Sequence, residues 1–313
     1  MKNKGMRAFL LLAIFLLTAQ VHSTQWNPNQ LPRPKWRTHG IVDKKGVRQI
    51  LDIAYYSGKD ADPIKHKLDL YLPEGKTNFP VLIFIHGGGW SGGDKRITFD
   101  VYGDLGRRFA KKGVGVVCIN YRLAPQFKFP TQIQDVARAF AWVYNNIEKY
   151  GGDKNRIFVC GHSAGGHLTA LLATDERWLA EVGLSLKNIR GAIPISGVYN
   201  FLWVKKIKVS DAGKRMLKDL FGENYTDDRL KDASPLYHIE PEKLLPPFLV
   251  LYGGLDFPTL PAQAKEFAQK LEENGYEVYL KRYDLRNHYT MIIDIRNLGD
   301  KAQMDILEFI RKH

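Results

Sequence analysis

The sequence predicts an α/β fold, with a mostly parallel, twisted β-sheet covered by helices on both faces. Two strand-like segments come first, near residues 48–72. Short apolar runs then alternate with longer segments in which apolar residues recur every three or four positions. Antiparallel strands followed by repeated strand–helix units are typical of a mixed sheet between two helical layers.

The first two strands are expected at residues 48–56 and 67–72. The earlier segment is rich in β-branched and aromatic residues, and the later one places Leu68, Leu70 and Leu72 on one face. The segments after these are continuously apolar, as strands buried on both faces of a parallel sheet are. These strands are expected at residues 80–85, 114–119, 156–160, 191–195, 247–252 and 276–283.

Helices are expected between these strands, because apolar residues there recur at helical spacing. They lie at residues 132–149, 166–172, 261–273 and 302–312. With 313 residues and 44% hydrophobic residues, the chain has ample material for a packed core, which excludes a wholly disordered protein. Two cysteines exclude a disulfide scaffold and a four-cysteine zinc site.

Residues 1–23 are expected to be a secretory signal peptide, which leaves 24–313 as a single domain. Basic residues precede an apolar run at 8–17 that is short for a membrane span, and small residues follow near Ser23. An uncleaved anchor and a lipid attachment are the alternatives. No later segment is apolar enough for a membrane helix. The protein is therefore expected to be secreted or periplasmic, without stable membrane insertion.

The sequence Gly-His-Ser-Ala-Gly at residues 161–165 lies between an apolar strand and a helix, as a nucleophile elbow does. Such a turn strains the serine backbone and crowds the residues two positions away, so Gly161 and Gly165 suit it. It would place Ser163 at a helix N-terminus, with the amide of Ala164 facing an oxyanion. The alternative is a glycine-rich turn with a structural serine.

A second motif, His-Gly-Gly-Gly-Trp at residues 86–90, ends the 80–85 strand. Its glycines let the backbone approach a ligand, and the amides of Gly88 and Gly89 can donate to an oxyanion. A tight loop or another kind of anion site is also compatible with this motif alone. Beside a nucleophile elbow, however, it indicates an oxyanion hole.

These two motifs, with Tyr-Arg-Leu-Ala-Pro at 121–125, resemble the hormone-sensitive-lipase-like branch of the α/β-hydrolases. The His-Ser-Ala-Gly-Gly-His form at 162–167 is closer to the small esterases grouped with feruloyl esterases, arylformamidases and prenylcysteine methylesterases. The similarity begins near residue 50 and implies an α/β-hydrolase fold, with the catalytic residues in the order serine, acid, histidine. The lipase-like members usually have Asp where His162 stands.

This order predicts Asp256 as the catalytic acid and His288 as the base for Ser163. Asp256 lies in a strand–loop–helix connection, and His288 follows the last strand. Asp284 is the rival acid, and a capping role is the alternative for Asp256. In this arrangement the histidine takes the serine proton while the aspartate orients the imidazole ring.

The substrate pocket is expected to include Trp90, His162 and His167, although His167 can equally serve packing alone. No histidine spacing typical of a metal site is present, so no metal is expected, and no cofactor is implied. Residues 198–246 form a long insertion that we interpret as a partly helical lid, with the N-terminal arm at 24–36 as a second cover. A solvated excursion is the alternative.

The predicted function is a serine carboxylesterase acting on feruloyl, acetyl or other short-acyl esters, either small molecules or polysaccharide-linked. An arylformamidase-like amide hydrolase is the enzymatic alternative, and an inactive carbohydrate- or envelope-binding protein is the non-enzymatic one. The net charge of +13 permits anionic partners, but the basic residues are dispersed and no nucleic-acid motif occurs. The sequence indicates no oligomeric contact.

Cys118 and Cys160 end two predicted strands. In the strand order that the resemblance implies, the strand ending at Ile85 lies between them. That places the thiols about 9–10 Å apart, too far for a disulfide. Two buried free thiols are therefore expected.

Overall fold

The computed structural model describes residues 41–42, 46–97, 100–205 and 210–313. The predicted signal peptide and the arm at 24–36 lie outside the described residues, as do Lys206 and Lys208 of the insertion. The part of the chain from Thr38 to His313 forms one compact unit. The sheet and the helices that cover it all belong to this unit.

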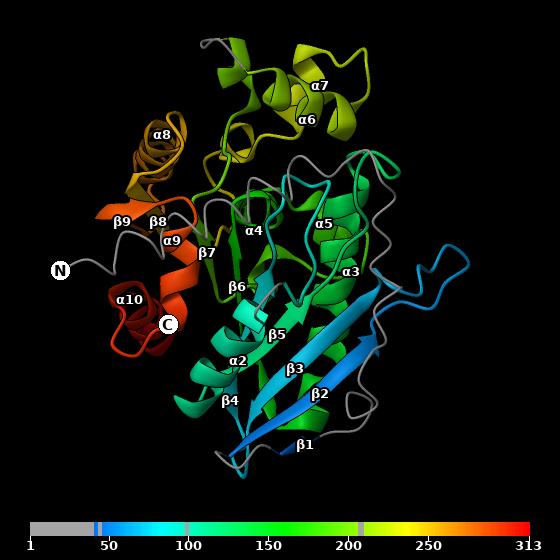
Figure 1. Ribbon diagram of the computed structural model, residues 1–313, viewed down its shortest axis with the longest axis vertical. Coiled ribbons are helices and arrows are strands. Elements are labelled where there is room, and N and C mark those ends of the chain that lie inside the picture. The colour runs from blue at the N-terminus through cyan, green and yellow to red at the C-terminus, as the bar shows by residue number, and fades with distance from the viewer. Residues whose placement is uncertain (1–40, 43–45, 98–99, 206–209) are drawn as a thin grey trace, which may run out of the picture. The chain divides into compact units, whose positions relative to one another are not determined.

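A single mixed sheet of nine strands runs through the described part of the chain (Figure 1). Its order is β1-β2-β3-β5-β4-β6-β7-β8-β9. The first three strands pair antiparallel, β3 pairs antiparallel with β5, and all later neighbours are parallel. The strands are β1 (Ile41–Val42), β2 (Val47–Ala54), β3 (Lys67–Pro73), β4 (Phe79–Ile85), β5 (Gly115–Ile119), β6 (Gly152–His162), β7 (Gly191–Ile195), β8 (Phe248–Leu255) and β9 (Val278–Asn287).

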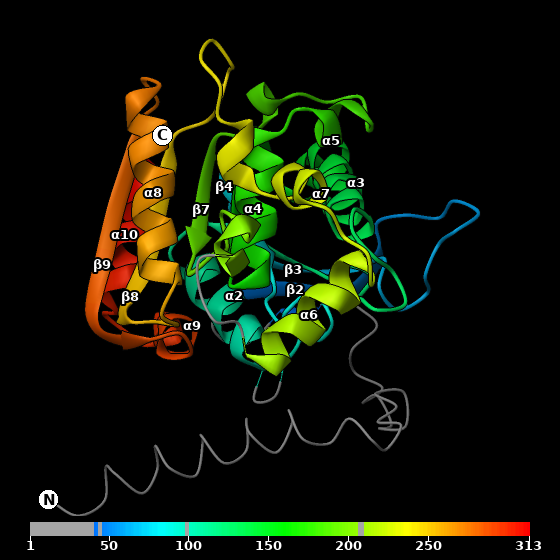
Figure 2. The same cartoon turned by 90° about the horizontal axis from the view of Figure 1, so that it is seen from above.

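Helices cover both faces of this sheet, because each buried strand exposes apolar side chains on both sides. One face packs against α3 (Thr131–Asn146), α4 (Ala164–Thr174), α5 (Arg177–Ala180) and α8 (Leu260–Glu273). The other face packs against α2 (Val101–Lys111), α9 (Thr290–Ile293) and α10 (Lys301–Lys312). Figure 2 shows α3 and α4 on one side of the strands.

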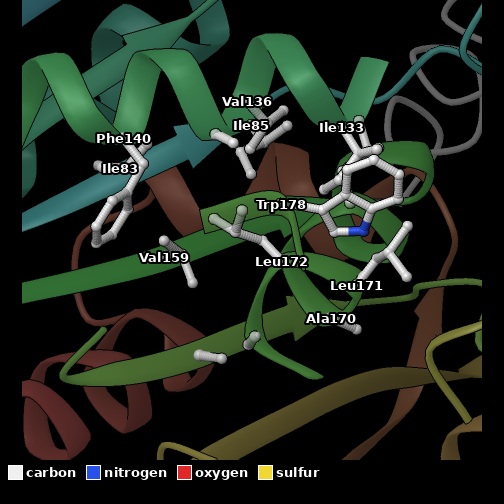
Figure 3. Close-up of a cluster of buried hydrophobic side chains, with 14 of the residues drawn as sticks. Ile83, Ile85, Ile133, Val136, Phe140, Val159, Ala170, Leu171, Leu172 and Trp178 are labelled. Atoms are coloured by element: carbon white, nitrogen blue, oxygen red, sulfur yellow. The ribbon is translucent and has the colours of Figure 1, made fainter. Parts of the chain in front are cut away.

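The core between α3, α4 and the central strands is built mainly from apolar side chains. Figure 3 shows Ile83 and Ile85 of β4 facing Val136 and Phe140 of α3, with Leu172 of α4 close by. All five side chains are buried. This packing fixes the carboxyl end of β4 relative to α4, which is where the two sequence motifs lie.

The predicted strands and helices are present, with shifted ends. β6 begins four residues earlier than expected and β9 continues to Asn287, so residues 284–287 are strand rather than loop. The helix expected at 132–149 ends at Asn146 and continues as a 3₁₀ turn, Ile147–Tyr150. Helix α2 was not expected, because its apolar residues alternate with glycine and arginine.

Both cysteines are buried free thiols, as predicted. Phe84 of β4 pairs with Cys118 of β5 on one side and with Cys160 of β6 on the other. A full strand therefore separates the two thiols. Within the described ranges, no helix has the length and apolar character needed to cross a membrane.

Candidate active site

Ser163 lies in a sharp turn between β6 and α4. Its backbone is strained, with φ 57° and ψ −119°, a conformation that L-residues rarely adopt. A methyl group built on Gly165 would lie 2.0 Å from the carbonyl oxygen of Ile85, and one on Gly161 would lie 2.3 Å from the carbonyl oxygen of Gly165. Only glycine fits at these two positions, so the turn is the predicted nucleophile elbow in geometry.

The three residues expected to form a catalytic triad come together at the carboxyl ends of the strands. Nε2 of His288 lies 2.9 Å from Oγ of Ser163, and Nδ1 of His288 lies 2.7 Å from Oδ1 of Asp256. An ionised carboxylate only accepts hydrogen bonds, so Nδ1 carries the proton and Nε2 is free to accept the serine proton. This hydrogen-bond chain is the arrangement that activates a serine nucleophile.

The environment of Asp256 keeps its carboxylate ionised. Burial alone would raise the pKa of Asp256, but the hydrogen bond and charge of His288 and the Ser196 hydroxyl outweigh burial and lower it. Asp284, the rival acid, is an exposed residue of β9 that pairs with Arg282 at 2.7 Å. The structure therefore brings Asp256, and not Asp284, to His288.

Two further polar side chains support the triad. The Ser196 hydroxyl donates to Oδ2 of Asp256 at 2.5 Å. His162 donates from Nε2 to the carbonyl oxygen of His288 at 2.9 Å, and the two imidazole centroids are 4.6 Å apart. Burial and then His288 lower the pKa of His162 to about 3, so His162 is neutral at neutral pH.

Ser196 was not expected from the sequence, and His162 was expected in the pocket. Ser196 directly follows β7, and β7 lies next to β8, whose loop carries Asp256. In the sequence, the serine at the end of this strand is visible. Its contact with Asp256, however, follows only from the order of the strands in the sheet. His162 is buried against His288, and its pocket role stays a prediction.

The His-Gly-Gly-Gly-Trp loop passes directly beside the nucleophile. A methyl group on Gly87 would lie 3.2 Å from Cβ of Ser163. Gly88 has φ 118° and Gly89 φ 59°, and the Gly88 carbonyl accepts hydrogen bonds from the amides of Ser91 and Gly92. Ala164 begins α4, so its amide has no partner within the helix. Gly87 thus lies beside Ser163, and the oxyanion role of the Gly88, Gly89 and Ala164 amides stays a prediction.

The segment at residues 86–97, which we call the oxyanion loop, is anchored at its far end by a buried charge cluster. Asp69 of β3 is fully buried and accepts from Nζ of Lys95 at 2.8 Å and from Nε of Arg96 at 2.6 Å. Lys95 also contacts Asp52 at 2.7 Å. Burial would raise the pKa of Asp52, but Lys95 and Arg96 lower it to about 2. Removing one partner of such a cluster would leave a buried charge unpaired, which is costly.

Trp90 and His167 connect the oxyanion loop to the β7–β8 connection. The Trp90 indole is buried and donates from Nε1 to Nδ1 of His167 at 3.0 Å. His167 donates from Nε2 to the carbonyl oxygen of Ala233 at 2.7 Å. Burial lowers the pKa of His167 to about 4. Both ring nitrogens of His167 are therefore occupied, and substrate contact by Trp90 or His167 stays a prediction.

The predicted insertion at 198–246 contains two helices, α6 (Asp211–Phe221) and α7 (Asp227–Asp232), which lie together in Figure 1. A methyl group on Gly89 would lie 3.2 Å from Sδ of Met216, so α6 reaches the oxyanion loop. Its outward basic side chains Lys214, Arg215 and Lys218 are exposed. Over the described ranges, no three His, Cys, Asp or Glu side chains group as metal ligands would.

Comparison with known proteins shows which proteins this chain is similar to. The BD-FAE family model matches residues 68–271. A probable isoprenylcysteine α-carbonyl methylesterase of Oryza sativa subsp. japonica is 31% identical over 79% of this chain and 60% of its own length. Esterase LipC of Mycobacterium tuberculosis is 36% identical over 61% of this chain and 48% of its own length. The chain thus spans about half to three fifths of these relatives.

A solved structure of a truncated carbohydrate esterase from gut microbiota has a TM-score of 0.73 at 20% identity. The alignment covers 88% of this chain and 99% of that one. At this identity the likeness shows the fold alone. With the sheet order and the helices on both faces, it confirms the α/β-hydrolase fold that the sequence motifs imply.

Proposed function

The chain belongs to the BD-FAE family, and from this premise we propose that it is a serine carboxylesterase. The observation that carries the proposal is the hydrogen-bond chain from Ser163 through His288 to Asp256. The named relatives are esterases, which supports the same chemistry. The strained backbone of Ser163 at a helix N-terminus adds support, because such strain concentrates at functional sites.

In the proposed reaction, Oγ of Ser163 attacks the ester carbonyl carbon while Nε2 of His288 takes its proton. The carbonyl oxygen becomes an oxyanion that accepts hydrogen bonds from the amides of Gly88, Gly89 and Ala164. The C–O bond to the alcohol then breaks, and His288 returns the proton to the leaving oxygen. Water repeats the two steps on the acyl-enzyme and releases the acid.

The proposed substrates are feruloyl, acetyl or other short-acyl esters, free or linked to polysaccharide. The relatives named as a probable isoprenylcysteine α-carbonyl methylesterase and an esterase support ester hydrolysis by this chain. A comparison of rates on nitrophenyl acetate, methyl ferulate, acetylated xylan and N-formylkynurenine tests this proposal. A preference for N-formylkynurenine would favour an arylformamidase-like hydrolase instead.

Replacement of the nucleophile tests the mechanism. We expect Ser163→Ala to lower kcat on nitrophenyl acetate by about 10⁴-fold or more, because the oxyanion donors alone retain little of the rate. Covalent labelling by a fluorophosphonate, measured by intact mass, should occur in the unaltered protein and be absent in Ser163→Ala. Near-normal hydrolysis by a folded Ser163→Ala protein would contradict the proposal, and failure to label the unaltered protein would favour a binding role.

We also propose that the protein is exported through its N-terminal segment. The support is the basic, apolar and small-residue order of residues 1–23. The mass of the protein recovered outside the cytoplasm checks this proposal, because cleavage after Ser23 leaves Thr24 as the first residue. An intact N-terminus on a protein retained with the cells would contradict it.

A further inference from the structure

Ser196 occupies an unusual place in the sheet. It is the first residue after β7, is 1% exposed and has φ 49°, a left-handed conformation that serine rarely adopts. Its amide donates to the carbonyl oxygen of Leu251 in β8 at 2.8 Å. The strained backbone is thus tied to the strand that leads to Asp256. Strain at a buried residue persists only where the surroundings enforce it, and it concentrates at functional sites.

The hydroxyl of Ser196 completes the hydrogen bonding of the Asp256 carboxylate. Oδ1 of Asp256 accepts from Nδ1 of His288 at 2.7 Å and from the amide of Phe257 at 2.8 Å. Oδ2 accepts from the Ser196 hydroxyl at 2.5 Å and from the amide of Gly253 at 3.3 Å. Of the two donors to Oδ2, the Ser196 hydroxyl is the side-chain donor. Its hydrogen bond is also the shorter of the two.

We propose that Ser196 is a positioning residue of the triad, whose hydroxyl holds the Asp256 carboxylate in the orientation that directs His288 toward Ser163. The proposal rests on the proposed function, because it assigns Ser196 a role in the same reaction. Ser196 acts through Asp256 and does not contact the reacting atoms. Its left-handed backbone is the conformation that places the hydroxyl against Oδ2.

The loss of this hydroxyl would have two consequences. A carboxylate without its Oδ2 side-chain donor can rotate about the Cβ–Cγ bond, so the imidazole is held less firmly and the rate falls. Without the hydroxyl, the carboxylate interacts more strongly with the imidazole of His288. It therefore stabilises the protonated imidazole more than before. The acid limb of kcat/KM against pH therefore moves to higher pH.

Because the backbone of Ser196 is left-handed, the effect of the hydroxyl on the reaction can be separated from its effect on stability. Ser196→Gly removes the hydroxyl and suits φ 49° better than serine does, whereas Ser196→Ala removes it and keeps the strain. Asn78→Gly is a matched backbone control, because Asn78 has φ 55° and precedes β4 at the opposite end of the strands. Asn78→Gly should retain the unaltered kcat/KM and pH profile.

For Ser196→Gly we expect kcat/KM on nitrophenyl acetate to fall about 10- to 100-fold, as for a lost hydrogen bond to a charged group. The acid limb should move up by roughly half a pH unit. The downfield proton resonance of the His288–Asp256 hydrogen bond should also shift, and this readout needs no turnover. Ser196→Ala should show the same changes in kcat/KM, acid limb and resonance. Its thermal stability should be lower than that of Ser196→Gly, because alanine keeps the backbone strain.

A Ser196→Gly protein with unaltered kcat/KM, acid limb and downfield resonance would overturn the proposal, whatever happens to its stability. If the unaltered protein hydrolyses no ester, the proposed function fails, but the resonance still decides the role of Ser196. A shifted resonance would then support the positioning role, and an unshifted one would overturn it.

Discussion

Two regions meet beside the candidate site, and they differ in the contacts that hold them. The oxyanion loop is tied down by polar contacts: Lys95 and Arg96 pair with buried Asp69 at its far end. The β7–β8 connection, residues 197–246, reaches the site through α6, which contacts the loop by the Met216 side chain and packs on the core by Leu217 and Leu220.

The ion pairs of the two regions also differ in how deeply they are buried. Asp69 is fully buried, whereas Asp211 and Lys214 of α6 form an exposed pair at 3.4 Å. Removing one partner of a buried pair is costly, whereas exposed pairs contribute little to stability. The loop at residues 86–97, whose amides we propose as oxyanion donors, is thus anchored by buried charges. In the β7–β8 connection, α6 packs by apolar contacts, and another part of the connection accepts a hydrogen bond from His167 at the Ala233 carbonyl.

The largest expected effect is from breaking the buried cluster. Asp69→Asn leaves Lys95 and Arg96 without a full counter-charge, and we expect a loss of about 3–5 kcal/mol in the free energy of unfolding. Urea unfolding measures it. Asp211→Ala on α6 is the matched control and should cost less than about 1 kcal/mol. Equal losses in the two variants would show that the two regions are not held differently.

The next effect concerns His167, which connects the two regions. Its folded pKa of about 4 lies below the ordinary 6.5, so the unfolded chain takes up a proton first as pH falls. The stability that His167 contributes is therefore full above pH 6.5 and is lost as the pH falls toward 4. The expected slope from this residue is about 1.4 kcal/mol per pH unit in that range.

His167→Gln tests this dependence, because glutamine retains an acceptor and a donor but does not titrate. The free energy of unfolding, measured by urea from pH 4 to pH 7, should depend less steeply on pH in the variant. A slope equal to that of the unaltered protein would show that His167 does not stay neutral in the fold.

The smallest expected effect is at the contact between the regions. Met216 is partly exposed, so Met216→Ala should change the free energy of unfolding by less than about 1 kcal/mol. We expect a larger change in KM for bulky acyl esters than in kcat, because the side chain borders the loop without orienting the triad. Lys214→Ala, on the exposed face of α6, is the control. A loss of stability as large as that of Asp69→Asn would contradict the comparison.

Local patterns in the sequence were sufficient to predict much of the candidate site. The elbow at Ser163 depends on glycines two residues away, and the oxyanion loop on consecutive glycines. Both are properties of a few neighbouring residues. The strands that lead into the two motifs could also be predicted locally, because a strand buried on both faces needs an unbroken apolar run.

The tertiary structure decided which distant side chains meet. Asp256 follows β8, whereas β9 extends through Asp284 and leaves it exposed beside Arg282. Ser196 meets Asp256 because β7 and β8 are neighbours. Asp69 lies opposite Cys118 of β5, and the Lys95 amide donates to Asn120 just after β5, so Asp69 and Lys95 meet through β5. A local pattern determines backbone geometry over a few residues, whereas contacts across tens of residues depend on strand order and register.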